Sequence, residues 1–469
     1  MVLINDFLFG NLRRIWIVFF IYAAVSAFFL QLVVLPYGFP ELHAGNGLWV
    51  GGDWVGFHQI AVELSEKIVL EGWSVWELRP KRQAPAGIAA VVYVFFGHHP
   101  WLLIPLNAAV HATTGLLLVC MARFLVRNTL HALVCAVPFV CLPSVLGWYA
   151  QIHKDGVYFL GILMCLYGWI LMSRLEIWNG RLVQILPPLL YLYVGVLLTW
   201  IMRPYGAQLM AIVGFIFAAV LAPRFLFGVL QRKLRFSRAI VASFMVVALP
   251  ASLGIFNDRA DKGEVTVVDY AKLTEKNSEE SPRNSFEEKA TNTIAELEWR
   301  RTDWLPTSLD NGSLTISVVR SGYASLVGDS NIDTDVRFSS ALEAVSYLPR
   351  ALQIGLTAPF PTNWFERSVI HLVSAAEMVF VYTTLLFVPY ALWRWRKRLD
   401  FWMMFGFSIG FIWLYAFITP NVGSLYRTRF GFLMLMVALG VSGAIALWQR
   451  VLARTLPNKR AGLRFLWDN

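Results

Sequence analysis

Residues 15–35 read IWIVFFIYAAVSAFFLQLVVL, an apolar run that begins directly after Arg13 and Arg14. A helix of this length crosses about 30 Å of hydrocarbon, and it closes its backbone hydrogen bonds internally, as lipid requires. The run is too long for the core of a signal peptide. We therefore interpret it as a retained membrane anchor.

The composition of the whole chain agrees with lipid as its main solvent. Of 469 residues, 57% are hydrophobic and 15% are aromatic, and the mean hydropathy is +0.57. These values exclude an ordinary soluble enzyme. The net charge of +10 comes from short basic segments beside apolar runs, which indicates membrane topology and not nucleic-acid binding. The cysteines lie in apolar runs without metal-ligand spacing, so we treat them as small core residues: Cys120, Cys135, Cys141 and Cys165.

Runs of similar character predict an all-α integral membrane protein with about ten transmembrane helices. The predicted spans are Ile15–Leu35, Leu102–Ala122, Ala132–Trp148, Val157–Met172, Leu186–Ile201, Ala207–Leu221, Ile240–Phe256, Val369–Trp393, Phe401–Ile418 and Phe430–Leu447. With both termini in the cytoplasm, every inside loop is basic, as the positive-inside rule asks. Counting Ile88–Phe96 as a further span would place the basic clusters around Lys233 and Lys397 outside, so we reject that count.

Two large segments then lie outside, and they divide the chain into three parts. Residues 1–256 form an N-terminal module whose outside loop, 36–100, holds an interfacial helix over Trp54–Val69 and a juxtamembrane or re-entrant helix over Pro85–Gly97. Residues 257–367 form an insertion that is polar at first and then becomes a small α/β or irregular cap. Residues 368–469 form C-terminal spans and a basic tail. For the interfacial helix we expect an apolar side made of Val55, Ile60, Val62, Leu64 and Ile68.

The first outside loop contains GGDWVGFHQIAVELSE, in which Asp53 precedes the interfacial helix. A carboxylate near a helix N-terminus is stabilised as the anion, and at a membrane surface it is placed to accept a proton from a substrate hydroxyl. Asp53 is therefore a candidate catalytic base. The alternative is an ordinary helix cap.

The short outside loop WYAQIHKDG places Lys154 and Asp155 at the membrane boundary. Asp155 is a second candidate catalytic residue, suited to a metal, a hydroxyl or an amine, and Lys154 is suited to a phosphate. The alternative is a polar loop in which Lys154 snorkels and Asp155 caps the next helix.

Several arginines lie at outside ends, where the topology rule disfavours positive charge. Arginine offers a planar fork for phosphate, so their convergence would suit a lipid-phosphate or pyrophosphate headgroup. The alternatives are simple contact with lipid phosphates and, for the arginine in YLPRAL, a salt bridge within the cap. The candidates are Arg203 in MRPYG, Tyr426, Arg427 and Arg429 in SLYRTRFG, and Arg350 in YLPRAL.

Other polar features of the sequence are weaker indications of function. The run GDSNIDTDV resembles the opening of a calcium loop, but it lacks the glycine and the twelfth-position glutamate, so a hydrogen-bonded turn is favoured. His111 and Glu377 stand inside apolar runs, and we favour interhelical contacts over a proton relay for them. Walker, dinucleotide-binding, HExxH and GxSxG motifs are absent from the sequence. No cofactor is indicated, and a divalent metal is left open.

The order of these pieces resembles the GT-C superfamily of polyprenyl-phosphate-sugar-dependent glycosyltransferases, in particular the bacterial family 39 and aminoarabinose-transferase type. Such enzymes carry an acidic residue before an interfacial helix, then a proline, aromatics and FG ahead of a span, and an arginine-rich motif late in the chain. The places are filled here by Asp53, Pro85, Tyr93, Phe96, Gly97, Asn107, Lys154, Asp155, Tyr426, Arg427 and Arg429. A single Asp53, with Gly52 before it and His58 after it, departs from the usual acidic pair of protein mannosyltransferases and favours a glycan or lipid acceptor. We place His58 with the substrate-binding residues.

The resemblance implies a multi-pass hexosyl- or pentosyltransferase of the bacterial inner membrane that acts in cell-envelope polysaccharide or lipopolysaccharide biosynthesis. Its partners would be a polyprenyl-phosphate-linked sugar, a glycan or lipid acceptor and membrane lipids. Some of Arg203, Lys154, Arg427 and Arg429 would hold the phosphate, while Asp53 deprotonates the acceptor and the sugar inverts. One alternative is a Wzy-type polysaccharide polymerase or O-antigen ligase, which uses diphosphate-linked glycans and needs no acid in the first loop. A lipid-linked sugar transporter should show internal pseudo-symmetry, which the sequence lacks.

Overall fold

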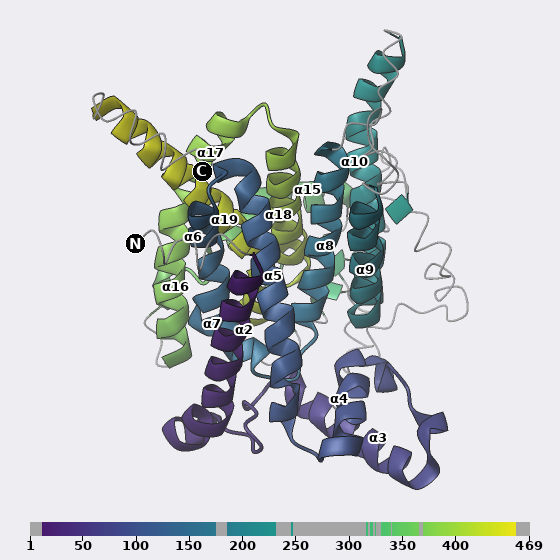
Figure 1. Cartoon of the computed structure of the whole chain (residues 1–469). Coiled ribbons are helices and arrows are strands. Elements are labelled where there is room, and N and C mark those ends of the chain that lie inside the picture. The colour runs from purple at the N-terminus through teal and green to yellow at the C-terminus, as the bar shows by residue number, and fades with distance from the viewer. Residues whose placement is uncertain are drawn as a thin grey trace. The chain divides into compact units, whose positions relative to one another are not determined.

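The computed structural model describes residues 12–174, 185–230, 245–246, 316–364 apart from 318, 322–323, 325–329 and 339, and 369–455. Within these ranges the regular structure is helical, and the only β pairing consists of two isolated bridges, His43–Trp49 and Asn331–Asn421 (Figure 1). The described residues contain no strand, so they do not support the predicted α/β form of the cap. An all-helical architecture is confirmed for that part of the chain.

The elements follow one another along the chain with short connections. The helices are α2 (Leu12–Phe29), η1 (Leu30–Gly38), η2 (Pro40–Leu42), α3 (Asp53–Glu71), η3 (Trp73–Val75), η4 (Pro80–Arg82), α4 (Ala84–Phe96), η5 (Pro100–Leu103), α5 (Ile104–Val126), α6 (Thr129–Cys141), α7 (Pro143–Tyr149), α8 (Asp155–Arg174), α9 (Leu186–Met202), α10 (Pro204–Leu230), α15 (Ala341–Thr357), η8 (Pro361–Asn363), α16 (Val369–Leu385), α17 (Val388–Trp395), α18 (Leu399–Ile418) and α19 (Val422–Thr455). Of these, η1 is a π-helical continuation of α2, and the other η elements are single 3-10 turns.

Six helical stretches in the described residues are long and apolar enough to cross a membrane. They are Leu12–Gly38, Pro100–Val126, Asp155–Arg174, Leu372–Trp395, Leu399–Ile418 and Val422–Ala453. The pair α6 and α7 adds a seventh if it counts as one span, although it bends by 61° where Pro143 follows Leu142. Proline disfavours a helical conformation in the residue before it, which explains the break. Helices α9 and α10 contain shorter apolar stretches, and predicted span Ile240–Phe256 lies outside the described residues except for 245–246.

Contacts group the chain into two compact units. Unit 1 comprises Met1–Asn257, Thr383–Phe407 and Met434–Asn469, and unit 2 comprises Asp258–Tyr382 and Ser408–Leu433. In unit 1, α5 packs against α2, α6 and α8, while α8 packs against α9. In unit 2, Ser408 of α18 donates a hydrogen bond to the Phe432 carbonyl of α19 at 2.6 Å.

The two helices within residues 36–100, α3 and α4, pack against each other. Helix α3 begins at Asp53 after Gly52 and ends at Gly72, whose φ of 88° lies in the left-handed region. Its buried face is Trp54, Phe57, Ile60, Ala61, Leu64, Ser65 and Ile68. The expected apolar side holds for Ile60, Leu64 and Ile68, which are buried. Val55 and Val62 are partly buried and pack at the edge of the same cluster, because the fully buried stripe follows the i, i+3, i+4 spacing that starts at Trp54.

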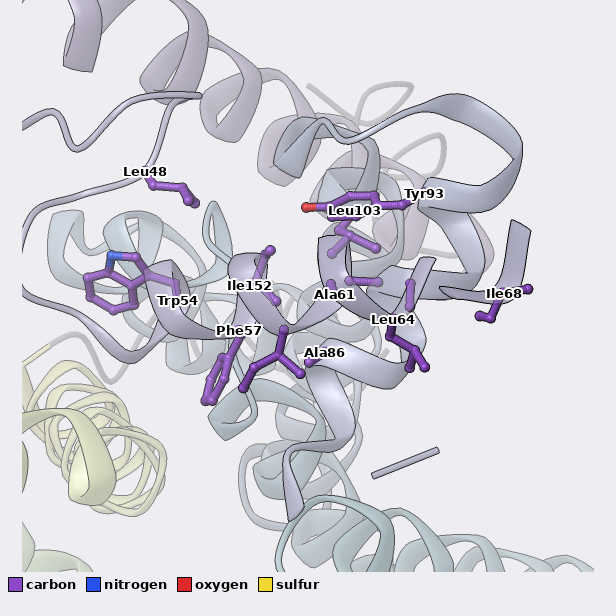
Figure 2. Packing of buried hydrophobic residues seen from close by; sticks show 13 residues of the cluster. Leu48, Trp54, Phe57, Ala61, Leu64, Ile68, Ala86, Tyr93, Leu103 and Ile152 are labelled. Atoms are coloured by element: carbon purple, nitrogen blue, oxygen red, sulfur yellow. The ribbon is translucent and has the colours of Figure 1, made fainter. Parts of the chain in front are cut away.

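This face of α3 joins α4 and the loop before α8 in one apolar cluster. Ala86 and Tyr93 come from α4, Leu103 from η5 and Ile152 from the loop before α8, and Figure 2 shows them around the α3 side chains. Since Ile152 is only 2% exposed, the loop that carries Lys154 and Asp155 is anchored on α3. Burial of such side chains stabilises the arrangement by about 1.5–3 kcal/mol each.

Helices α8 and α9 approach most closely at glycines. A Cβ atom on Gly195 of α9 would lie 2.5 Å from the Gly161 carbonyl oxygen of α8 and 2.6 Å from Cys165 Sγ. Small residues at such crossings allow backbones to approach in a membrane. The packing of α9 on α8 therefore depends on the absence of a side chain at residue 195.

We expect Gly195→Ala to lower the free energy of unfolding by about 1–3 kcal/mol, because overpacking forces the helices apart. Thermal unfolding of the purified protein in detergent measures the effect. Gly410→Ala in α18 is the matched control, since a Cβ there meets no atom within 4 Å. Alanine also favours helix over glycine by about 1 kcal/mol, so the control should be as stable as wild type or more so. Equal losses in both variants would contradict the packing model.

Candidate functional site

Two buried side-chain amides, those of Asn107 and Gln151, hold the loop between α7 and α8 in place. Asn107 of α5 donates hydrogen bonds to the carbonyl oxygens of Tyr149 and Gln151 at 2.9 and 2.8 Å. Gln151 in turn donates to the Gly47 carbonyl at 3.1 Å and accepts from the Trp49 backbone N–H at 3.2 Å. Satisfied buried polar groups of this kind hold a backbone in one conformation. The residues that follow, Lys154 and Asp155, are therefore presented on a rigid base.

Asp155 begins α8 and forms an ion pair with Arg203. The two side chains are only 16% and 9% exposed. Arg203 stands at the break between α9 and α10, where Pro204 starts the next helix, and it also hydrogen-bonds the Tyr205 hydroxyl. Its guanidinium lies 5.1 Å from the ring centroid of Tyr158. Because breaking a buried pair leaves an uncompensated charge, each partner holds the other in place.

Lys154 connects this pair to helix α3. Its side chain is buried, and Nζ lies 5.4 Å from the ring centroid of Phe57 in α3. Asp53 stands one turn earlier on the same helix, as its first residue, with Gly52 at the N-cap position. The N-cap residue is thus Gly52 and not Asp53, as the alternative had it. Asp53 is an acidic residue of the first turn, where the helix dipole favours an anion.

Arg79 joins the same region and was not among the sequence-predicted residues. It donates a hydrogen bond to the Trp200 carbonyl at 2.8 Å, and its guanidinium lies 4.1 Å from the Trp200 ring centroid. Trp200 is in the last turn of α9, so the loop before α4 reaches the helix that ends at Arg203. The signal that pointed to Arg203, a positive charge on a predicted outside loop, applies equally to Arg79.

His58 bridges α3 and α4. Its Nδ1 lies 2.8 Å from the Tyr93 hydroxyl, and its Nε2 lies 3.5 Å from the Asn46 side-chain amide. Burial lowers the pKa of the His58 imidazole below its ordinary value, and the nearby His98 and His99 lower it further. Its substrate-binding role stays a prediction.

The remaining sequence-predicted residues belong to unit 2. Arg350 of α15 forms a bidentate ion pair with Asp333, at 3.0 Å from Nε and 3.2 Å from Nη2, and Tyr347 donates to the same carboxylate at 3.0 Å. Burial opposes ionisation, but the hydrogen bonds from Arg350 and Tyr347 outweigh it and lower the pKa of Asp333. This is the salt bridge within the cap that the sequence offered as the alternative for Arg350.

Arg320 and Arg350 both contact Asp333 in the run GDSNIDTDV. Arg320 is 1% exposed and donates to the carbonyl oxygens of Phe417 at 2.7 Å and Asp333 at 3.0 Å. The Asp333 carboxylate is engaged by Arg350 and Tyr347 as described, so the favoured turn fits and a calcium ligand role for it does not. Asp329 of the run lies outside the described residues.

The arginine-rich motif SLYRTRFG lies within a helix. Because α19 starts at Val422, Tyr426, Arg427 and Arg429 occupy its first turns, earlier than the predicted span start at Phe430. Arg429 is fully buried and donates to the carbonyl oxygens of Ile354, at 2.6 Å, and of Gly355 and Ala358. These are at the C-terminus of α15, where a cation is stabilised. The phosphate-binding role of these arginines stays a prediction.

The two ionisable residues inside apolar runs make interhelical contacts. Glu377 of α16 accepts a hydrogen bond from the Tyr426 hydroxyl of α19. His111 of α5 lies 3.3 Å from the Val140 carbonyl of α6, and its ring stacks between those of Phe139 and Tyr149. Both arrangements fit the favoured interpretation. No group of three or more metal-ligating side chains occurs in the described part of the chain.

The structure therefore brings together the start of α3, Lys154, Asp155 and Arg203 in unit 1, while Arg350, Tyr426, Arg427 and Arg429 belong to unit 2. Comparison with known proteins adds nothing to this grouping: no family model, curated protein or solved structure matches the chain.

A pH dependence follows from the lowered pKa of His58. The folded protein resists protonating this imidazole, so its contribution to stability is full above the unfolded-state pKa of about 6.5 and is lost as pH falls through that value toward the folded-state pKa. His58→Gln cannot titrate, so its melting temperature should fall less than that of wild type between about pH 7.5 and about pH 5. Tyr93→Phe removes the hydroxyl partner but keeps the imidazole, and it should retain the wild-type slope. A wild-type slope in His58→Gln would contradict this origin.

Proposed function

We propose that the chain is an inverting membrane glycosyltransferase of the bacterial inner membrane. It moves a sugar from a polyprenyl-phosphate donor to a glycan or lipid acceptor on the non-cytoplasmic face, in the synthesis of cell-envelope polysaccharide or lipopolysaccharide. The proposal is supported by the six apolar helices in the described residues that are long enough to cross a membrane and by the residue cluster at the start of α8.

The observation that carries the proposal is the buried ion pair of Asp155 and Arg203 beside buried Lys154. Lys154 and Arg203 bring two cationic side chains to the N-terminal end of an apolar helix. Removing such groups from water is costly, so their retention favours a role. The helix dipole of α8 adds positive potential at the same point. We infer that an incoming phosphate accepts hydrogen bonds from both cations.

The chemistry then needs a base, and we assign this role to Asp53. Asp53 takes the proton from an acceptor hydroxyl, the resulting oxygen attacks the anomeric carbon, and the bond from that carbon to the lipid phosphate breaks. The phosphate leaves with the bonding electron pair, so negative charge grows on it in the transition state. Lys154 and Arg203 stabilise that charge more in the transition state than in the ground state.

The role that we propose for Asp155 differs from the catalytic role expected from the sequence. Because its carboxylate accepts from Arg203, it orients the guanidinium, and we assign it as a positioning residue that acts through Arg203. His58 fixes α3 on α4 in the same way, through Tyr93.

The first test is a transfer assay with purified protein in nanodiscs and a panel of polyprenyl monophosphate and diphosphate sugars. Wild type should use monophosphate donors, and Asp53→Asn should lower kcat by roughly a hundredfold or more, as loss of a general base does. Glu66→Gln on the exposed side of α3 is the matched control and should retain activity. Turnover with diphosphate-linked glycans alone, indifferent to Asp53→Asn, would instead establish a polymerase or ligase.

The polymerase or ligase alternative depends on outside arginines that can receive a diphosphate. In unit 2, Arg350 is held by Asp333, and Arg429 is surrounded by carbonyl oxygens. This geometry favours the transferase, whose phosphate site lies in unit 1.

The positioning role of Asp155 has its own test in a double-mutant cycle. Arg203→Gln should lower kcat/KM by roughly tenfold to a hundredfold, because a charged hydrogen bond to the leaving group is lost. Asp155→Asn should lower it less in wild type and have little further effect in the Arg203→Gln background. Additive losses in the double variant would show that Asp155 acts independently of Arg203.

A further inference from the structure

A second basic site lies at the other end of α8. A cavity of about 470 Å³ is lined by Arg123 and Arg127 of the α5 end, Arg174 of the α8 end, and Arg398 and Asp400 at the α18 start. All of these residues belong to unit 1. Four guanidiniums against one carboxylate leave three net positive charges in a cavity of the size that holds small ligands.

The carboxylate fixes two of the arginines. Arg398 forms a bidentate pair with Asp400 at 3.0 and 2.6 Å, and Arg174 approaches the same carboxylate at 3.7 Å. Arg174 also stacks over the Phe124 ring, with its guanidinium 4.2 Å from the centroid. Asp400 accepts from the Phe401 backbone N–H as well, so it is already well satisfied. These forks are therefore held in place before any ligand binds, which reduces the entropic cost of binding.

The other two arginines supply the unbalanced charge. Arg123 and Arg127 are exposed, and neither forms an ion pair with a carboxylate in the described residues. The helix C-termini of α5 and α8 already stabilise cations there, but helix dipoles and membrane topology explain only the presence of positive charge. They do not explain a cavity with two guanidiniums fixed by a buried acid. That combination is typical of a site for an anion.

The position of the cavity indicates the source of the anion. Three of the helices long enough to span a membrane, Pro100–Val126, Asp155–Arg174 and Leu399–Ile418, end or begin at this cavity. The end of a span lies at the level of the lipid headgroups, where basic pockets between helices bind anionic lipids. We propose that the cavity binds the phosphate group of an anionic membrane lipid.

This lipid site is separate from the site at Asp155. The 20 residues of α8 lie between Asp155 and Arg174, which corresponds to roughly 30 Å of helix. The proposal therefore goes beyond the proposed transferase function and does not depend on it.

The test is native mass spectrometry of the protein in neutral detergent, titrated with phosphatidylglycerol and, in parallel, with zwitterionic phosphatidylcholine. Wild type should retain phosphatidylglycerol preferentially. The double variant Arg123→Gln/Arg127→Gln should bind it at least roughly tenfold more weakly, since charged hydrogen bonds to the phosphate are lost. Arg394→Gln removes an exposed charge from the neighbouring α17 without touching the cavity, and it should bind like wild type.

Three results would overturn the proposal. Equal binding of both lipids to wild type would remove the preference for an anionic headgroup. Equal weakening in Arg394→Gln and in the double variant would assign the effect to general surface charge. Stabilisation of wild type by inorganic phosphate as large as that by phosphatidylglycerol, in thermal unfolding with the double variant insensitive to both, would assign the cavity to a soluble phosphate and not to a lipid.

Discussion

The cost of placing a charge among apolar helices is the constraint on which this structure depends. Arg203, Arg320 and Arg429 are almost completely buried, and each is compensated in its own way: by the Asp155 carboxylate, by the carbonyl oxygens of Asp333 and of Phe417 near the end of α18, and by carbonyl oxygens at the end of α15. A guanidinium suits this role because it carries five donors and stays protonated. Arg320 and Arg429 therefore satisfy buried backbone oxygens, a task that apolar contacts alone cannot perform.

The candidate site in unit 1 depends on a second condition, the rigid support of its loop. The amides of Asn107 and Gln151 satisfy the backbone before α8, and Ile152 inserts into the cluster formed by α3 and α4. Polar and apolar anchors on successive residues leave Lys154 and Asp155 little freedom. A site that acts by electrostatic stabilisation gains from such support, because its charges need no reorganisation during the reaction. The same reasoning applies to the arginines fixed by Asp400.

Several sequence-based predictions were right because they rest on local physics. The helices found over the predicted segments Trp54–Val69 and Pro85–Gly97, and most of the long apolar helices, follow from hydrophobic runs and from glycine at the ends. Other predictions were displaced by packing. Val55 and Val62 lie off the buried stripe of α3, and α19 begins eight residues before the predicted span, because a helix continues into polar sequence when its first turns find partners such as Glu377 and the α15 carbonyl oxygens.

The sequence by itself determined that the chain is helical, rich in membrane-length apolar segments, and charged at their ends, since each of these properties depends on neighbours within one or two turns. Only the tertiary structure decided which partner each charge receives. Arg203 and Asp155 are 48 residues apart, Arg429 and Ile354 are 75 apart, and Arg320 and Phe417 are 97 apart. Such pairs depend on which helices pack together, and a single sequence holds no local signal for that choice, because a buried arginine is equally well satisfied by a carboxylate or by helix-end carbonyl oxygens.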